Sequence, residues 1–443
     1  MKHLHLHAGS LLSLLLTMLS GLPGARADEW PQWRGPRRDG VWRETGIVER
    51  FKDNALSFRW RAPVGPGYAG PAVAGGRVFL LDRQAARNTE RVVALEARTG
   101  KGLWTHEYPC RYRGVSYDSG PRCTPTVDEG KVYALGTMGH LHCLDAERGN
   151  VIWSKDYVKD FGARIPTWGI ASAPLIDGER LIALVGGRDG ATVVALRKDT
   201  GSEIWRALPE QSIGYAPPII IERGGARQII VWTPERVVSV DPANGKVFWQ
   251  EPFTSKEGLS VGTPVLDGDR LLVSAFYNGT LMLGLAADRP AASVLWRGRS
   301  SSEMEPETDG LHSLISTPLV KGEFIYGVCS YGALRCLRAG TGERVWATYE
   351  ATGNGRWWNA FIVAQGDREF LANEQGDLII ARLTPEGYRE ISRAKLLDPT
   401  NRALRRDVVW SHPAFAYRHI FARNDREIVC ASLAADGGEM KVE

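Results

Sequence analysis

The sequence predicts an all-β fold, namely an eight-bladed β-propeller of four-stranded antiparallel blades whose ring is closed by an N-terminal strand. A motif that recurs at about 43 to 54 residues predicts this architecture, because supersecondary repeats of such lengths stack into rings or solenoids. In most copies a Gly stands four residues before a Trp, as in Gly100 and Trp104, Gly149 and Trp153, Gly201 and Trp205, Gly245 and Trp249, and Gly342 and Trp346.

Each copy of the motif contains four short runs of alternating polarity, separated by Gly, Asp or Asn turn signals. One copy has its runs at Thr126–Val127, Val132–Leu135, Leu141–Asp145 and Val151–Ser154. Four such strands make one antiparallel blade, which cannot bury both of its faces alone, so the copies must stack and close into a ring. The Gly suits a tight turn with positive φ, and we expect the Trp on the outermost strand to pack against the next blade.

Seven full copies run from Gly70 to Leu396, and an eighth, from Trp410 to Leu433, supplies only three strands. The missing strand is predicted at Leu56–Val64, where Trp60 stands in the docking position and would close the ring between the two ends of the chain. A seven-bladed ring is the alternative if the divergent copy around Gly387 is irregular.

Residues 1–27 read as a secretory signal, since Lys2 and the apolar stretch Leu11–Leu22 precede an Ala-x-Ala pattern that ends at Ala27. The apolar stretch is shorter than the roughly 20 residues of a membrane-spanning helix, and no cysteine follows it to accept a lipid. We therefore expect a periplasmic or secreted, monomeric protein without a membrane anchor. Residues 28–55 are predicted to form an N-terminal latch, and residues 56–443 the propeller.

The formal net charge is +4, and removal of Lys2 and Arg26 with the signal leaves about +2 (4 minus 2), which gives no general attraction to nucleic acid. Six cysteines occur without a C-x-x-C motif, which argues against a zinc ribbon or covalently bound haem. Cys110 and Cys123 are the candidate disulfide, with free thiols as the open alternative. Cys143 and Cys336 occupy equivalent repeat positions and are interpreted as small core residues.

The segment from Val132-Tyr133-Ala134 to Leu144-Asp145-Ala146, with Gly149 and Trp153, resembles the repeat of the pyrroloquinoline-quinone-like (PQQ-like) propeller family. This resemblance implies one of two kinds of protein: quinoprotein dehydrogenases, which hold PQQ and usually calcium on the propeller axis, or non-enzymatic scaffolds of outer-membrane β-barrel assembly. The segment from Trp30 to Pro36 also resembles the N-terminal signature of secreted bacterial PQQ-like proteins.

The sequence departs from the dehydrogenase pattern, because no two cysteines are adjacent and the chain is shorter than those enzymes. We therefore expect no cofactor, with PQQ and calcium as the alternative. The scaffold lipoprotein is acylated at an N-terminal cysteine, which this sequence lacks. Trp30 and Trp33 are interpreted as covering the side or end of the propeller, with ligand contact as the alternative.

Loops that join the outer strand of one blade to the inner strand of the next gather on one face, around the channel, where propellers bind ligands. Seven of the 15 tryptophans occupy docking positions and three lie in the N-terminal segment, which leaves five, four of them near this face. Such aromatic rings beside Arg groups could bind a planar anion, a sugar or a peptide, or they could plug the channel. The candidate ligand-binding residues are Arg122, Trp168, His312, Arg356, Trp357, Trp358, Asn359, Trp410 and His412.

Other polar clusters carry weaker signals. The acidic run Glu303–Asp309 could bind calcium but lacks the spacing of a known calcium loop, so a solvated loop, or pairing with Arg402, Arg405 and Arg406, is the interpretation. His140 and His142 alternate along one strand and are assigned a packing role. No Ser-His-Asp order, phosphate loop or H-E-x-x-H motif occurs.

The sequence thus predicts a non-catalytic periplasmic binding or scaffold protein whose partner is an envelope protein or a small ligand. A PQQ-dependent dehydrogenase that oxidises an alcohol or sugar is the first alternative, and a carbohydrate-binding accessory protein is the second. Whether the mouth of the channel is open or plugged separates a binding protein from a merely packed axis.

Overall fold

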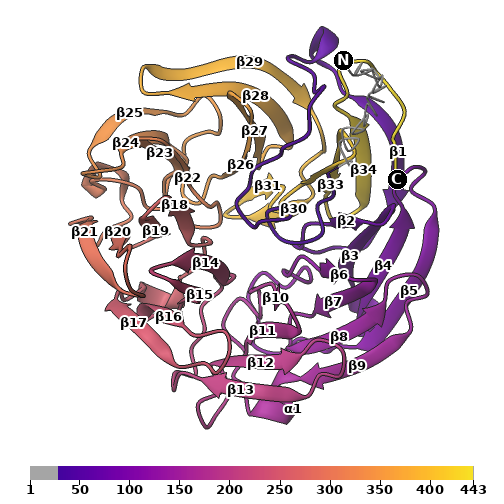
Figure 1. Cartoon of the computed structure of the whole chain (residues 1–443). Coiled ribbons are helices and arrows are strands. Elements are labelled where there is room, and N and C mark those ends of the chain that lie inside the picture. The colour runs from indigo at the N-terminus through magenta and orange to yellow at the C-terminus, as the bar shows by residue number, and fades with distance from the viewer. Residues whose placement is uncertain (1–27, 443) are drawn as a thin grey trace, which may run out of the picture.

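The computed structural model describes residues 28–442, so the predicted signal at residues 1–27 lies outside the described residues. Eight four-stranded antiparallel sheets surround a central axis like the blades of a wheel (Figure 1), which confirms the prediction of an eight-bladed propeller. The divergent copy around Gly387 forms a regular blade, so the seven-bladed alternative is wrong.

The blades are numbered in chain order, and in blades 1 to 7 the strands run outward from the axis. Blade 1 consists of β2 (Ala72–Ala74), β3 (Arg77–Gln84), β4 (Thr89–Glu96) and β5 (Gly102–Pro109), and blade 2 of β6 (Thr126–Asp128), β7 (Lys131–Leu135), β8 (His140–Asp145) and β9 (Val151–Asp156). Blade 3 consists of β10 (Leu175–Asp177), β11 (Arg180–Leu184), β12 (Val193–Arg197) and β13 (Glu203–Ala207), and blade 4 of β14 (Ile219–Arg223), β15 (Ala226–Trp232), β16 (Arg236–Val240) and β17 (Val247–Pro252).

Blades 5 to 8 complete the ring. Blade 5 consists of β18 (Val265–Asp267), β19 (Arg270–Ala275), β20 (Gly279–Leu285) and β21 (Ala292–Arg297), and blade 6 of β22 (Leu319–Lys321), β23 (Phe324–Val328), β24 (Leu334–Arg338) and β25 (Arg344–Thr348). Blade 7 consists of β26 (Ala360–Gln365), β27 (Arg368–Asn373), β28 (Asp377–Thr384) and β29 (Gly387–Lys395). Blade 8 consists of β32 (Ala414–Ala416), β33 (His419–Arg423), β34 (Glu427–Ser432) and, from the N-terminal side, β1 (Ser57–Pro63).

A few short elements lie in the connections. The helix α1 (Tyr157–Phe161) follows β9, and the described residues contain four 3-10 turns, at Lys52–Asn54, Ala85–Arg87, Lys256–Gly258 and Glu305–Glu307. The connection between blades 7 and 8 contains the small hairpin of β30 (Asn401–Ala403) and β31 (Arg406–Val408). In the described part of the chain, no helix is long and apolar enough to cross a bilayer.

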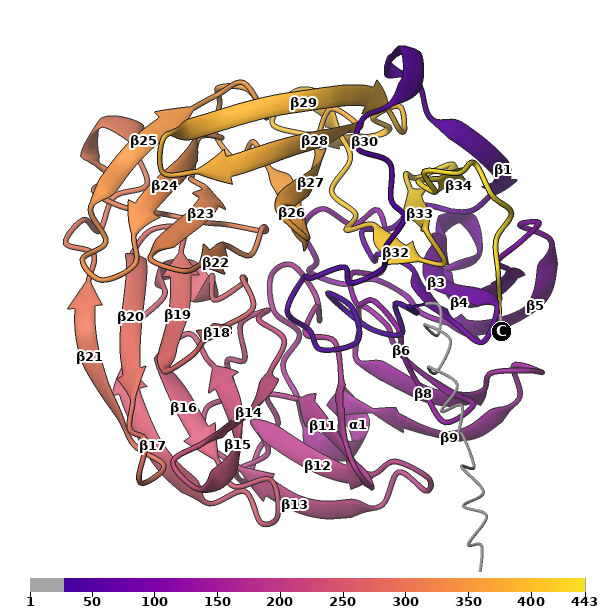
Figure 2. The ribbon, with the colours of Figure 1, turned by 45° about the horizontal axis from the view of Figure 1, so that its top comes forward.

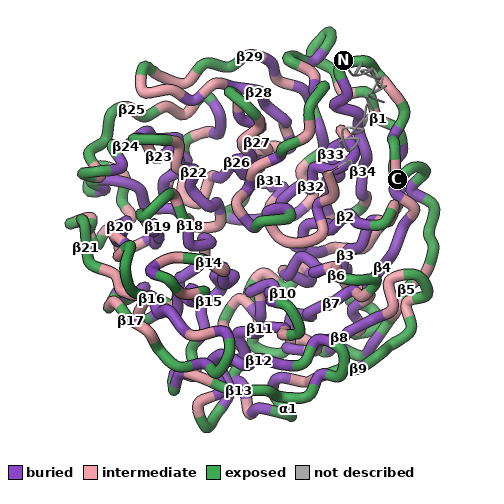
Figure 3. The backbone as a smooth tube through the Cα atoms, viewed as in Figure 1, coloured by how far each residue is buried: buried purple, intermediate pink, exposed green. Residues whose placement is uncertain are grey.

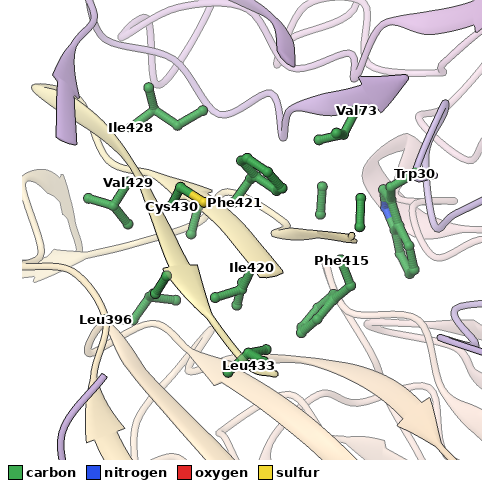
Figure 4. Packing of buried hydrophobic residues seen from close by; sticks show 14 of the residues in the cluster. Trp30, Val73, Leu396, Phe415, Ile420, Phe421, Ile428, Val429, Cys430 and Leu433 are labelled. Atoms are coloured by element: carbon green, nitrogen blue, oxygen red, sulfur yellow. The ribbon is translucent and has the colours of Figure 1, made fainter. Parts of the chain in front are cut away.

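The ring closes as the sequence predicts, because β1 pairs antiparallel with β34 and sets Trp60 opposite Cys430. The fully buried Arg423 stabilises the junction of blades 8 and 1, where its guanidinium donates to the carbonyl oxygens of Gly65 and Leu81. Figure 4 shows the buried apolar residues of blade 8 between its neighbours, with Phe415 beside Trp30. Non-covalent closure between two distant segments therefore completes the fold.

The recurring spacing of Gly and Trp within the repeats has a direct structural reason. The indole of Trp153, on the outer strand of blade 2, lies against Gly201 of blade 3, where an added Cβ would come 2.8 Å from the ring. Its Nε1 donates to the carbonyl of Lys198, also in blade 3, at 2.9 Å. Equivalent hydrogen bonds to the next blade are made by Trp60, Trp104, Trp205, Trp296 and Trp346.

One docking tryptophan differs, and the sequence explains it. Blade 5, which follows Trp249, has Ala292 where most other copies have Gly. The Nε1 of Trp249 donates instead to the Gln228 side chain of its own blade, at 2.9 Å. The outermost strand β5 keeps its other face in solvent, whereas the inner strand β2 is fully buried (Figure 3).

The N-terminal segment, residues 30–48, crosses the axis and enters the channel from the end opposite the inter-blade loops (Figure 2). Trp30 exchanges two backbone hydrogen bonds with Val73 of β2, and the Trp42 amide donates to the Ala364 carbonyl of β26 at 2.8 Å. Trp30 and Trp42 are 2% and 1% exposed, so both belong to the core. We call residues 30–48 the plug segment.

The disulfide predicted between Cys110 and Cys123 is not formed. All six cysteines have free, buried thiols. Cys110 packs in the apolar cluster between blades 1 and 2, whereas the thiol of Cys123 lies 3.7 Å from the Ile170 carbonyl. The interpretation of Cys143 and Cys336 as small core residues is confirmed by their complete burial.

Candidate functional site

A cavity of about 180 Å³ lies on the propeller axis, above the plug segment. All eight inter-blade loops contribute to its wall, and the inner strand β26 and the plug segment contribute one residue each. Aromatic side chains dominate the lining, which consists of Trp33, Tyr68, Tyr117, Arg122, Trp168, Ala171, Tyr215, Pro217, Leu259, Val261, Leu314, Ile315, Trp357, Phe361, Trp410 and His412. The axial aromatic residues therefore leave a cavity and do not fill the channel.

The floor of the cavity consists of Trp33, Phe361 and His412. The ring centroids of Trp33 and Phe361 each lie 5.0 Å from the imidazole of His412. The Nε1 of Trp33 donates to the Thr263 hydroxyl at 2.8 Å, which fixes the indole across the axis. The plug segment thus forms one wall of the site.

Arg38 holds the plug segment inside the channel. Its guanidinium is buried and donates to the carbonyl oxygens of Ala173, at 3.2 Å, of Pro218, at 3.1 Å, and of Pro174. These carbonyls directly precede β10 and β14, the inner strands of blades 3 and 4. Burial lowers the pKa of Arg38 to about 9, because no carboxylate compensates the desolvated charge.

His412 is a neutral imidazole with one free acceptor. Burial and the nearby Arg34 cation lower its pKa to about 3. Its Nδ1 lies 2.7 Å from the Pro413 carbonyl, which can only accept, so Nδ1 carries the proton and Nε2 carries the lone pair. In residues 28–442, this buried Nε2 has no hydrogen-bond partner.

The rim of the cavity is an aromatic triad of Tyr117, Trp357 and Trp410. The ring centroids lie 5.8 Å apart for Tyr117 and Trp357, 5.9 Å for Tyr117 and Trp410, and 6.3 Å for the two tryptophans. Tyr117 and Trp357 have φ angles of 53° and 69°, which bulky residues rarely adopt. Such strained backbone occurs where the surrounding structure imposes a functional side-chain position.

The side wall carries polar groups that are already engaged. The guanidinium of Arg122 donates to the carbonyls of Gly120, at 2.6 Å, of Ser116, at 2.8 Å, and of Tyr117. Its carbon atom Cζ lies 5.1 Å from the centroid of the Tyr68 ring. Arg122 therefore shapes the loop between β5 and β6 and has few donors left for a ligand.

Five of the nine residues predicted for the channel mouth line the cavity, namely Arg122, Trp168, Trp357, Trp410 and His412. Trp168 packs edge-on against Tyr215, with centroids 5.8 Å apart, and its amide donates to the Tyr215 hydroxyl at 3.4 Å. The other four predicted residues support the loops.

The supporting residues are held by partners away from the axis. Arg356 pairs with Glu303 at 2.8 Å, and Trp358 packs under Arg406. The backbone carbonyl of Asn359 accepts a hydrogen bond from the backbone amide of Glu374. The side-chain carboxylate of Glu374 accepts hydrogen bonds from Trp410 and Arg406.

His312 is fully buried, with Nδ1 3.1 Å from the Phe276 carbonyl and Nε2 3.7 Å from Asp309. In the acidic run, Glu303 pairs with Arg356 and Glu305 pairs with Arg335. The interpretation that the run pairs with Arg402, Arg405 and Arg406 is wrong, and Arg406 pairs with Glu374.

Sequence reasoning missed much of the lining. The sequence predicts a covering role for Trp33, with ligand contact as the alternative, and the structure places this residue in the lining of the cavity. Tyr68, Tyr117 and Tyr215 lie in inter-blade loops, and their position relative to the repeat was the signal that could have identified them. The aliphatic residues Leu259, Val261, Leu314 and Ile315 give no such signal.

The residues of the cavity do not fit PQQ with calcium. PQQ is a fused tricycle with several carboxylates, and the one charged side chain among the lining residues is Arg122, whose donors bind carbonyls. Among residues 28–442, no three His, Cys, Asp or Glu side chains are grouped as metal ligands. Carboxylates placed here would lose their hydration without gaining partners.

A ring of four-stranded blades with docking tryptophans around an axial cavity defines the class of this protein as a PQQ-like repeat propeller. The family model described as "Outer membrane protein assembly factor BamB" matches residues 88–348, more than half of the chain. The chain belongs to this family.

Relatives of two kinds are similar to the chain. The outer membrane protein assembly factor BamB of Shewanella oneidensis is 25% identical over 57% of this chain and 63% of its own length. The quinoprotein alcohol dehydrogenase PedH of Pseudomonas putida is 25% identical over 45% of this chain and 33% of its own length. The chain thus spans less than two thirds of these relatives.

Solved structures share the fold. BamB from Moraxella catarrhalis superposes with a TM-score of 0.59 at 15% identity, covering 85% of this chain and 98% of that one. The quinohemoprotein alcohol dehydrogenase from Comamonas testosteroni superposes with a TM-score of 0.64 at 13% identity, covering 93% of this chain and 81% of that one. At such identities the likeness concerns the fold alone, because one fold can serve unrelated functions.

Proposed function

We propose that the chain is a non-catalytic binding protein, exported to the bacterial envelope, that takes a ligand into the axial cavity. The observation that carries this proposal is the aromatic cavity itself, which is bounded by all eight inter-blade loops and floored by the plug segment. Large apolar cavities with a few placed polar groups are the usual form of a small-ligand site.

The chemistry of the lining supports binding over catalysis. His412 is the one lining side chain that could act as a general base, and burial holds its pKa at about 3, too low to take a proton near neutral pH. No carboxylate lies beside it among the described lining residues. A proton-transfer step near neutral pH would therefore lack a general base in this lining.

The experiment is a binding screen with a variant whose cavity is filled. Ala171 lies in the loop between β9 and β10 and lines the cavity, and we expect the larger side chain of Ala171→Trp to occupy much of its volume. We expect at least one class among aromatic fragments, oligosaccharides and short peptides to bind the native protein and not the A171W variant, as measured by calorimetry. Binding that A171W leaves unchanged would contradict the proposal, and dye-linked oxidation of an alcohol or sugar with added PQQ and Ca²⁺ would overturn its non-catalytic part.

A second candidate function is that of a scaffold for an envelope protein, favoured by the match to the assembly-factor family over residues 88–348. A scaffold would use the outside of the propeller and not its axis. The same variant separates the two functions, because co-purification of an envelope protein that persists with A171W places the contact outside the cavity.

A further inference from the structure

A buried carboxylate, that of Glu374, lies beside the rim of the axial cavity and is not part of the lining. Glu374 directly follows β27, in the turn to β28, and is 1% exposed. Taking a carboxylate out of water is costly, and burial accordingly raises the pKa of Glu374. Because a buried ion pair often contributes no more stability than packed apolar residues would, the partners of this carboxylate indicate its role.

The side chain of Glu374 binds the connection between blades 7 and 8. Its Oε2 accepts a hydrogen bond from Nε1 of Trp410 at 2.8 Å, and its Oε1 accepts one from Nε of Arg406 at 2.5 Å. The backbone carbonyl of Glu374 also accepts from the amide of Val409, at 2.8 Å. The indole of Trp410 cannot turn about its side-chain bonds without breaking its hydrogen bond, so the ring is fixed at the rim.

The same residue reaches the connection that carries Trp357. The amide of Glu374 donates to the Asn359 carbonyl at 3.1 Å. The Arg406 guanidinium, which Glu374 holds, lies over the ring of Trp358, with Cζ 5.0 Å from the centroid. Trp357 directly precedes Trp358 and has a φ of 69°, which a bulky residue keeps only where its surroundings impose it. Glu374 therefore supports both tryptophans of the aromatic triad.

We infer that Glu374 is a positioning residue of the axial cavity. Its carboxylate holds Trp410 and, through Arg406, the loop of Trp357, so that the rim has its binding shape before a ligand arrives. A rim that is already ordered spares the ligand the entropic cost of ordering it. This inference rests on the proposed function, because it assigns a role in the same cavity.

Two matched variants of blade 7 test this role. Glu374→Gln keeps the size of the side chain but turns one acceptor into an NH2 donor, which then faces the donor of Trp410 or of Arg406. Glu369→Gln is the control, because Glu369 is a fully buried carboxylate on β27 that accepts from Lys321, at 2.8 Å, and from a backbone amide of β28, at 2.9 Å. Both variants should lose stability, but only Glu374→Gln should disturb the rim.

The readout is the fluorine NMR spectrum of the full chain, labelled with 5-fluorotryptophan and recorded without a ligand. Trp357→Phe and Trp410→Phe assign the two resonances of the rim, and Trp153→Phe assigns a docking tryptophan as the internal reference. Glu374→Gln should shift both rim resonances and leave that of Trp153 in place, whereas Glu369→Gln should leave all three in place. Unmoved rim resonances in Glu374→Gln, or equal shifts in the control, would overturn the inference.

A second variant keeps the test decisive if Glu374→Gln does not fold. The side chain of Arg406 is partly exposed, and Arg406→Met removes the guanidinium from the ring of Trp358 without adding a buried donor. The resonance of Trp357 should then shift. An unmoved resonance would overturn the inference.

The outcomes separate this inference from the proposed function, because the spectra need no ligand. Unmoved rim resonances overturn the role of Glu374, whereas ligand binding that A171W abolishes still supports the cavity as a site. Failure of every ligand class to bind overturns the proposed function and, with it, the site that Glu374 would serve.

Discussion

Replacing Arg38 by Met tests whether the plug segment is fastened by this one side chain. The Arg38 guanidinium donates to the carbonyls of Ala173, Pro174 and Pro218, and Met has similar length without a donor. The Pro174 carbonyl keeps the Thr126 hydroxyl as a donor, at 2.8 Å, so the loss falls on the other two carbonyls.

The magnitude follows from those two carbonyls. Each buried acceptor that loses its partner costs about 1–3 kcal/mol, which gives about 2–6 kcal/mol. Removing the cost of burying an uncompensated cation offsets part of this loss, so we expect the variant to lose about 2–4 kcal/mol of unfolding free energy. Arg43→Met is the matched control, since Arg43 lies in the same segment and forms an exposed pair with Asp39. Exposed pairs contribute less than about 1 kcal/mol.

Urea denaturation measures the free energy, and limited chymotrypsin digestion measures release of the plug segment. Chymotrypsin suits this test because Trp33 and Trp42 lie within the segment, neither is followed by proline, and no Arg is needed for cleavage. Arg38→Met should be cleaved there much faster than Arg43→Met. If the two variants were equally stable and equally resistant, Arg38 would not fasten the plug segment.

Two further predictions concern the blades. Gly201→Ala should lower the free energy of unfolding by about 2–5 kcal/mol, because its φ of 70° strains an L-residue and the new Cβ would meet the Trp153 ring at 2.8 Å. Gly130→Ala is the control: Gly130 has a φ of 73° and open space around it, so only the backbone strain of about 1–2 kcal/mol applies. Equal losses of unfolding free energy in urea denaturation would argue against the Trp contact. Burial and the neighbouring His106 and His140 hold the pKa of His142 at about 3, below its unfolded value of 6.5. The contribution of neutral His142 to the free energy of unfolding is therefore complete above pH 6.5 and is lost as the pH falls toward 3. His142→Phe should therefore resist acid better than the native protein by about 2 kcal/mol at pH 5, and parallel pH profiles of the unfolding free energy would contradict this.

The architecture could be predicted because most repeats contain the Gly and the Trp, at a fixed spacing, through which neighbouring blades pack. The Gly four residues before each Trp receives the indole of the preceding blade, as Gly201 receives Trp153. A residue pair that must fit its equivalent in the next copy imposes a regular spacing, which a single sequence displays directly. The same rule identified Trp60 as part of the closing strand, because a docking Trp without a blade of its own needs a partner strand.

The candidate site was only partly predictable, because its residues meet through ring closure and not through local spacing. Trp357 and Trp358 are adjacent in sequence, yet the first lines the cavity and the second packs under Arg406. The difference comes from the positive φ of Trp357, which no residue preference announces, since bulky aromatic residues avoid that region. Arg356 likewise turns to Glu303, 53 residues away in the sequence.

The parts of the chain that define the ligand site lie outside the repeated strands. The floor residue Trp33 comes from the plug segment, and the rim residues Tyr117 and Trp410 come from loops of different lengths. The repeat that places the chain in its family is accounted for by blade docking alone, so it carries no information about what occupies the axis. Assembly factors and quinoprotein dehydrogenases can therefore share this ring while the axis of each is shaped by its own loops. For this chain, eight aromatic side chains from these loops, the plug segment and β26 line the axial cavity, and they set its largely apolar character.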